Sequence, residues 1–96
     1  MTIVWSPQAL GDLKEAYLKI APDNPRAARA LHERIVSCVS LLLTSPHIGR
    51  PGRVAGTREM VVSGTSYIVP YRVAGERVQI LRVYHSSRQW PVAFDT

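Results

Sequence analysis

Cysteine is nearly absent from this sequence, with Cys38 the single one among 96 residues. One cysteine cannot form a disulfide within the chain, and no Cys/His pattern is present that would hold a structural zinc ion. A reducing cytoplasm is therefore the expected compartment, and no metal site is predicted. Long apolar runs and the basic start of a signal peptide are also missing, so the chain is not predicted to span a membrane.

The motifs of several common enzyme classes are absent as well. The sequence contains no phosphate-binding P-loop, no Gly-x-Gly-x-x-Gly after a strand, no His-Glu-x-x-His and no Gly-x-Ser-x-Gly. These absences exclude the common nucleotide-binding, zinc-protease and α/β-hydrolase classes. We therefore predict no cofactor.

Acidic residues are few, and the excess of positive charge is uneven. Seven Asp and Glu face twelve Lys and Arg, which gives a net charge of +5. Residues 45–96 carry seven basic side chains, all arginine, against three acidic ones. The planar guanidinium suits phosphate and carboxylate groups. We expect an anionic partner for this half of the chain: nucleic acid, anionic lipid or an acidic protein segment.

The first half of the chain predicts a short strand followed by two helices. Residues 2–5 are β-branched or aromatic, and Ser6-Pro7 and Asn24-Pro25 each combine a capping side chain with proline in the first helical turn. The apolar stripe of the first helix is predicted to be Leu10, Leu13, Ala16 or Tyr17, and Ile20, with Asp12, Lys14, Glu15 and Lys19 on the opposite face. The stripe of the second is predicted to be Ala28, Leu31, Ile35, Cys38 or Val39, and Leu42. The short connection near Pro22 predicts a helical hairpin.

The second half predicts a loop and three strands. Residues 44–56 are rich in Gly and Pro and form the loop, and strands are predicted over 57–62, 67–74 and 77–85. Pro70 lacks a backbone donor, which implies a bulge in the middle strand. The whole is predicted to be one α+β domain over residues 1–96, with the order β-α-α-β-β-β and the hairpin on one face of a mainly antiparallel four-stranded sheet.

Each group of arginines in residues 45–96 has two possible roles. Arg50 and Arg53, between loop glycines, either meet a phosphate or belong to a solvated connector. Arg58, Arg72 and Arg82, together with Tyr84, either mark a sheet face that the helices leave uncovered or form ion pairs at its rim with Glu59 or Glu76.

His85 ends the last predicted strand and is followed by Ser86, Ser87, Arg88 and Trp90. A titratable imidazole beside a guanidinium could transfer protons or clamp a phosphodiester. The alternative is a surface histidine at the end of the sheet with Trp90 packed beside it. The sequence leaves both interpretations open, and His32 and His47 are predicted to be solvated.

The order of elements and several segments resemble the RelE/ParE superfamily of toxins from bacterial type II toxin-antitoxin modules. The resemblance runs from Trp5 to Pro91, and its most specific pieces are Gly-Arg-x-Gly…Gly-Thr-Arg-Glu in the loop, Tyr-Ile-Val-Pro-Tyr-Arg-Val, and the terminal His-x-x-Arg-x-Trp-Pro. It implies a toxin that a cognate antitoxin, acidic and encoded in an adjacent frame, holds inactive. On this basis the antitoxin-binding residues are expected to be Leu10, Leu13, Tyr17, Arg58 and Arg82.

The resemblance also implies two possible activities, namely poisoning of DNA gyrase by ParE-like members and cleavage of messenger RNA on the ribosome by RelE-like members. His85 matches a histidine of some nucleases, but Ser86 stands where a tyrosine is expected, and the region of Gly52 and Arg53 has no acidic residue. We therefore expect a non-enzymatic ParE-like gyrase poison. Its target-binding residues are expected to be Arg58, Arg72, Arg82, His85, Arg88 and Trp90.

Two alternatives stay open. One is a metal-independent ribonuclease that uses His85 and Arg88, and the other is a member that binds antitoxin with little toxicity.

Overall fold

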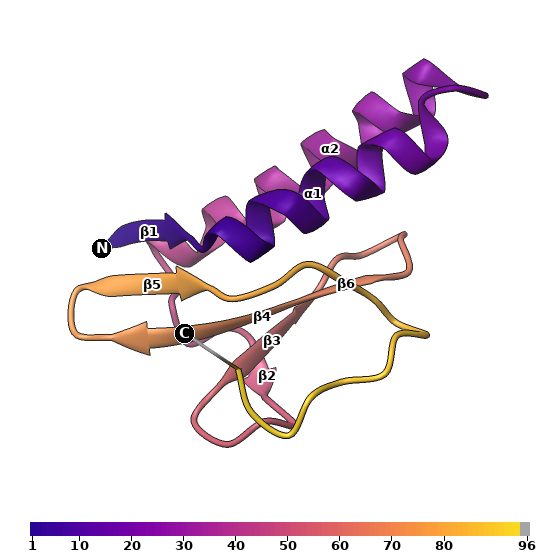
Figure 1. The fold of residues 1–96 in the computed structure, drawn as a ribbon. Helices are drawn as coiled ribbons and strands as arrows, with labels where there is room; N and C mark the ends of the chain where they lie inside the picture. Colours follow the sequence, from indigo (N-terminus) through magenta and orange to yellow (C-terminus); the bar gives the residue numbers. More distant parts are fainter. Residues whose placement is uncertain (95–96) are drawn as a thin grey trace.

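The computed structural model describes residues 1–94, in which a helical hairpin covers one face of a six-stranded sheet (Figure 1). The helices are α1 (Pro7–Ile20) and α2 (Pro25–Ser40), and α2 runs into a 3-10 turn, η1 (Leu41–Leu43). The strands are β1 (Thr2–Trp5), β2 (Arg50–Pro51), β3 (Arg58–Val61), β4 (Tyr67–Ala74), β5 (Arg77–Ile80) and β6 (Tyr84–His85). The predicted α+β class and the helical hairpin on a sheet are confirmed.

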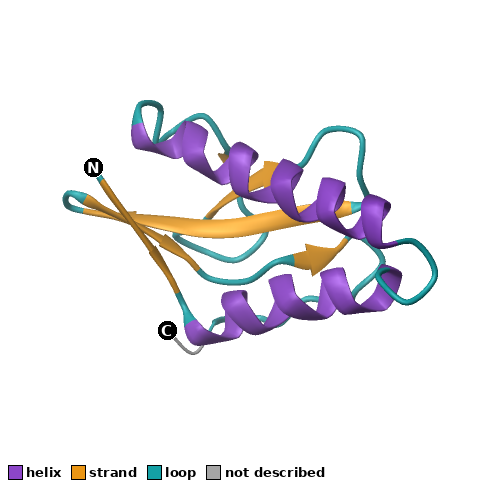
Figure 2. Ribbon diagram, turned by 90° about the horizontal axis from the view of Figure 1, so that it is seen from above, coloured by secondary structure: helices purple, strands orange, loops and turns teal. Residues whose placement is uncertain are grey.

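Both helices begin at the predicted caps. Ser6 Oγ accepts a hydrogen bond from the Ala9 N–H at 3.0 Å, and Asn24 Oδ1 accepts one from the Ala27 N–H at 3.0 Å. A proline follows each cap and presets the backbone for the first turn. The turn between the helices is short, so α1 and α2 lie side by side (Figure 2).

The sheet order is β1-β5-β4-β3-β2, with β6 also paired to β4. β1 lies parallel to β5, and the other neighbours are antiparallel. The expected four strands become six for two reasons. The predicted loop 44–56 contributes the short strand β2, and the predicted strand 77–85 is divided into β5 and β6.

The division lies opposite Pro70, which makes the prediction of a continuous strand over 77–85 wrong. Between the pairs Tyr71–Ile80 and Ile68–Tyr84, β4 has two residues and the facing chain has three. The Pro70 carbonyl accepts a hydrogen bond from the Leu81 N–H at 3.0 Å, so the proline nitrogen faces the same side but has no hydrogen to donate. The predicted irregularity therefore falls in the partner strand as a bulge over residues 81–83.

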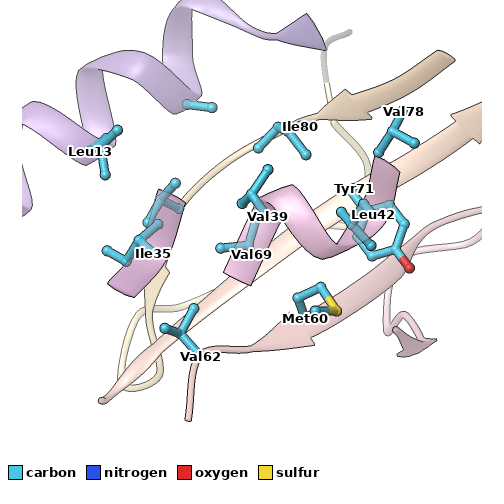
Figure 3. Close-up of a cluster of buried hydrophobic side chains, with 12 residues drawn as sticks. Leu13, Ile35, Val39, Leu42, Met60, Val62, Val69, Tyr71, Val78 and Ile80 are labelled. Carbon is cyan, nitrogen blue, oxygen red and sulfur yellow. The ribbon is translucent and has the colours of Figure 1, made fainter. Parts of the chain in front are cut away.

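The core lies between the hairpin and the sheet, and Figure 3 shows its side chains converging from both layers. The predicted stripe of α2 is confirmed, because Ala28, Ile35, Val39 and Leu42 are buried. The stripe of α1 is rotated from the prediction. Its buried residues are Ala9, Asp12, Leu13 and Ala16, whereas Leu10 remains 51% exposed. The short side chains of Ala9 and Ala16 bring α1 close to its neighbours, and Asp12, predicted to face outward, is buried.

The interpretation that Arg58 marks an uncovered face of the sheet does not hold, because Met60 in β3 and Val62 just after it have the same parity along the chain as Arg58. Both side chains are in the core under the helices. The C-terminal segment after β6 runs on the side of the sheet away from the helices (Figure 1). The sheet is therefore covered by helices on one side and partly by irregular segments on the other.

Candidate functional site

Asp12 ties helix α1 to the bulge that precedes His85. Its carboxylate accepts hydrogen bonds from Arg82 Nε at 2.7 Å and Arg82 Nη2 at 2.9 Å, and also from the Val83 N–H at 3.0 Å. The hydrogen bond to Asp12 raises the pKa of Arg82. Arg82 is thus turned toward the helix with its charge balanced, and it holds the bulge in place.

His85 is held by its own turn and faces a tyrosine. Its Nδ1 lies 2.7 Å from Ser87 Oγ and accepts a hydrogen bond from the Ser87 N–H at 3.2 Å. A backbone N–H only donates, so Nδ1 is the acceptor and the proton of the neutral imidazole is on Nε2. The Tyr67 ring lies edge-on to the imidazole, with centroids 5.4 Å apart. Burial, together with the negative charge of Glu15, raises the pKa of Tyr67.

Tyr67 is a residue that the sequence reasoning missed. The expectation of a tyrosine near His85 was tested only at the next position along the chain, where Ser86 stands. The structure supplies a phenol from the neighbouring strand instead, because Tyr67 of β4 pairs directly with His85 of β6. Pairing between the strand over 67–74 and the one that follows it could have indicated this contact. The bulge, however, shifts the pairing by one residue, so a regular hairpin would place Tyr67 opposite Tyr84 instead.

Two cavities meet at this pair and form what we call the His85 groove. One has a volume of about 570 Å³ and includes Arg88, and the other has a volume of about 530 Å³ and includes Arg34. Both are lined by Lys19, Tyr67 and His85. The lining thus combines the Tyr67–His85 pair with the basic side chains of Lys19, Arg34 and Arg88, and the carboxylates of Asp12 and Glu15 also line one of the two cavities.

A separate cavity, which we call the tail pocket, lies between the start of α1 and the C-terminal segment. Its volume is about 420 Å³, and its lining includes Gln8, Arg82, Tyr84, Arg88, Trp90 and Phe94. The guanidinium carbons of Arg82 and Arg88 lie 4.8 Å and 4.6 Å from the centroid of the Tyr84 ring. Trp90 packs edge-on to Tyr84 at 5.2 Å.

The six expected target-binding residues are thus divided. Arg82, Arg88 and Trp90 line the tail pocket, and His85 shares the adjoining groove with Arg88. Arg72 lies in β4, paired with Gln79 of β5, and lines neither cavity. Arg58 donates hydrogen bonds to the carbonyls of His47 at 3.2 Å and Gly49 at 2.9 Å, so it holds the loop.

The loop arginines are bound to an acidic residue of β3. Glu59 is 2% exposed, and its carboxylate accepts hydrogen bonds from the side chains of Arg50 and Arg53 and from the Arg53 N–H. Burial opposes ionisation of Glu59, but these hydrogen bonds and the charge of Arg53 outweigh it and lower the pKa below 4.5. Arg53 also stacks on Trp90, with its guanidinium carbon 3.9 Å from the ring centroid. Arg53 thus joins the loop to the C-terminal segment. The sequence predicted ion pairs at the exposed rim of the sheet, whereas the Glu59 carboxylate is buried.

The buried hydroxyl of Tyr71 fixes the loop from the core side. It accepts a hydrogen bond from the Gly49 N–H at 2.9 Å and donates one to the Pro46 carbonyl at 2.8 Å. The side chain itself is fully buried in the sheet. Residues 46–49 are therefore attached directly to the core.

The expected antitoxin-binding residues of α1 share another cavity, which we call the hairpin groove. Leu10, Leu13 and Tyr17 form it together with Lys14, Arg29 and His32, in a volume of about 440 Å³. The Tyr17 and His32 rings meet edge-on across the two helices, with centroids 6.4 Å apart. Arg58 and Arg82 do not line this groove, so the five expected antitoxin-binding residues do not form a single surface.

Within residues 1–94, no helix is long and apolar enough to cross a membrane. The same residues contain no group of three or more His, Cys, Asp or Glu side chains that could hold a metal ion.

Comparison with known proteins shows the class to which this fold belongs. Residues 3–90 match the family model described as the ParE toxin of the type II toxin-antitoxin system parDE. Similar curated proteins include a putative toxin, Y4kP, of Sinorhizobium fredii, 43% identical over 93% of this chain and 92% of that protein. Toxin RelE2 of Caulobacter vibrioides is 34% identical over 90% of this chain and 96% of that protein.

Solved structures show the same relationship. The chromosomal ParDE system from P. aeruginosa contains a chain that is 30% identical, with a TM-score of 0.81 over 88% of this chain and 95% of that one. The RelBE2 toxin-antitoxin complex from Mycobacterium tuberculosis gives 29% identity and a TM-score of 0.60 over the same shares of the two chains. The chain belongs to the ParE toxin family of type II toxin-antitoxin systems.

Proposed function

We propose that the protein inhibits bacterial growth by acting on DNA gyrase and that a cognate antitoxin neutralises it. The observation that carries the choice of target is the match to the ParE family model over almost the whole chain, together with the higher TM-score to the ParDE chain than to the RelBE2 chain. A gyrase poison needs a docking surface rather than proton transfer. Arg88 and Trp90 in the tail pocket supply an exposed cation and an aromatic ring for it.

The target is tested with purified protein, gyrase and supercoiled DNA, beside a ribosome-dependent cleavage assay. For a gyrase poison, His85→Ala leaves inhibition largely intact, whereas Arg88→Ala or Trp90→Ala weakens it. Retained antitoxin affinity in each variant shows that the fold is intact. Inhibition of gyrase that is unchanged in both tail variants would contradict the docking role of the tail.

A specific observation also favours the second candidate, a ribosome-dependent messenger RNA nuclease. His85 lines the groove, its neutral imidazole would carry the proton on Nε2, and the Tyr67 ring lies edge-on to it. For a nuclease, His85→Ala lowers cleavage by about 10²- to 10⁴-fold, as expected for a lost acid-base group. Cuts by the wild type that vanish in His85→Ala, with gyrase unaffected, would replace the first proposal with this one. Activity in neither assay, with antitoxin binding intact, would indicate a member with little toxicity.

We place the antitoxin in the hairpin groove, where an apolar floor has basic residues at its edge. Lys14 and Arg29 lie beside Leu10, Leu13 and Tyr17. An acidic amphipathic helix would bury its apolar face there and pair its carboxylates with the rim. Leu10→Ala should weaken antitoxin binding, whereas Leu41→Ala, which removes an equally exposed leucine outside the groove, should not. Equal effects of the two substitutions in a titration would place the antitoxin elsewhere.

A further inference from the structure

Arg88 occupies the boundary between the His85 groove and the tail pocket and lines both. Its side chain is exposed, and no carboxylate among residues 1–94 forms an ion pair with it. The other guanidinium of the tail pocket, that of Arg82, is bound in bidentate fashion by Asp12. The tail pocket therefore offers one available cation.

Aromatic rings line the same pocket, and this cation lies over one of them, Tyr84. Trp90 is partly exposed, carries Arg53 stacked on its ring and lies 6.4 Å from the Phe94 ring. Tyr84 is buried, with both arginines of the pocket over its ring. Gln8, in the first turn of α1, adds an amide that can donate and accept hydrogen bonds at the opposite wall. A volume of about 420 Å³ is enough for a single nucleotide.

These features together favour a ligand that is both flat and anionic. A single surface ion pair is too weak to hold an inorganic anion or an acidic side chain at Arg88 alone. Stacking of a base on an aromatic side chain adds a larger contribution than such an ion pair. A duplex hides the faces of its bases, so the base must be unpaired.

We propose that the tail pocket binds an unpaired base of a single-stranded nucleic acid, with the base against Trp90 and its phosphate on Arg88. The backbone then continues into the His85 groove, where Lys19 and Arg34 supply positive charge beside the carboxylate of Glu15, since Asp12 is paired with Arg82. The inference goes beyond the proposed function, because the isolated protein should bind an oligonucleotide without gyrase or ribosomes.

The test uses Trp90 as its own reporter. The chain has two tryptophans, and Trp5→Phe leaves Trp90 as the single one. We expect single-stranded DNA or RNA of roughly six nucleotides to quench its fluorescence in a saturable manner. The duplex of the same sequence, inorganic phosphate and an acidic peptide of matched charge should not. Saturable quenching by the peptide instead of the oligonucleotide would show that the pocket serves a protein partner and would overturn the proposal.

Two further variants separate the pocket from general electrostatic attraction. In the Trp5→Phe background, Arg88→Gln should weaken oligonucleotide binding about tenfold, as for a lost hydrogen bond to a charged group. Arg77→Gln removes the same charge from an exposed position of β5 and should change the affinity less than about twofold. Equal losses in the two variants, or no quenching at all, would overturn the proposal. Circular dichroism and antitoxin binding confirm that each variant is folded, and a negative result leaves the gyrase assay unaffected.

Discussion

At the scale of single residues, the buried carboxylate of Glu59 makes stability depend on pH. Its pKa in the folded protein lies below the ordinary value of 4.5. The stabilisation is therefore fully present above the unfolded pKa and is lost as the pH falls through the folded one. We expect the free energy of unfolding to decrease as the pH is lowered from about 5. In urea titrations, the difference between the wild type and Glu59→Gln should shrink over this range, and a constant difference would contradict the assignment.

Replacing glycine by alanine should have opposite effects on stability at two positions, Gly49 and Gly11. A side chain at Gly49 would approach the Tyr71 ring to 2.6 Å and the Glu59 carbonyl to 2.9 Å, and both neighbours are buried. Gly11 lies in α1 with nothing within 4 Å of the added carbon. Gly49→Ala should lower the thermal midpoint, whereas Gly11→Ala should add about 0.5–1 kcal/mol of stability through its helix propensity. A neutral Gly49→Ala would mean that the loop does not press against Tyr71 in solution.

The residues that sequence reasoning placed poorly are those with a partner far along the chain. Asp12 has polar neighbours in sequence, so its burial became apparent only when Arg82 and Val83 were found against it. Tyr67 became a neighbour of His85 through strand pairing rather than through spacing. Local patterns do not contain the register across a bulge, and this is why the candidate site was predicted only in part.

At the scale of elements, the Asp12–Arg82 pair joins α1 to the bulge. Removing Asp12 leaves a partly buried guanidinium and the Val83 N–H without their acceptor. Asp12→Ala should therefore destabilise the protein by about 1–3 kcal/mol. In a double-mutant cycle with Arg82→Met, measured by urea unfolding, the two losses should not add, because either change breaks the same contact. Additive losses would indicate that the pair contributes nothing through its mutual contact.

Element boundaries followed from local chemistry wherever a cap, a glycine or a proline set them. The caps Ser6 and Asn24 and the strand over 67–74 lie where the sequence placed them. The sequence did not predict which face α1 buries. Its leucines and alanines fit the helical period on more than one face, so the pattern alone does not select one. The identity of the buried face was decided by the elements packed against it.

At the scale of the whole molecule, the net charge of +5 should influence association with an acidic antitoxin. Opposite charges steer the encounter and are screened within about 8–10 Å at moderate salt. We expect the association rate constant to fall as ionic strength rises, while the dissociation rate constant, governed by apolar burial in the hairpin groove, changes less. Surface plasmon resonance at low and high salt measures both. An association rate constant that is independent of salt would rule out an electrostatic contribution.

The attachment of the loop to Tyr71 has a consequence for cleavage by proteases. A loop of prolines, glycines and arginines is ordinarily an early target for trypsin. Here the Tyr71 hydroxyl holds Pro46 and Gly49, and Glu59 holds Arg53. Trypsin should therefore cut the native protein first after the exposed Arg88, and Tyr71→Phe should open a second early cut after Arg53. Mass spectrometry of the digest would show whether one buried hydroxyl protects an entire surface loop.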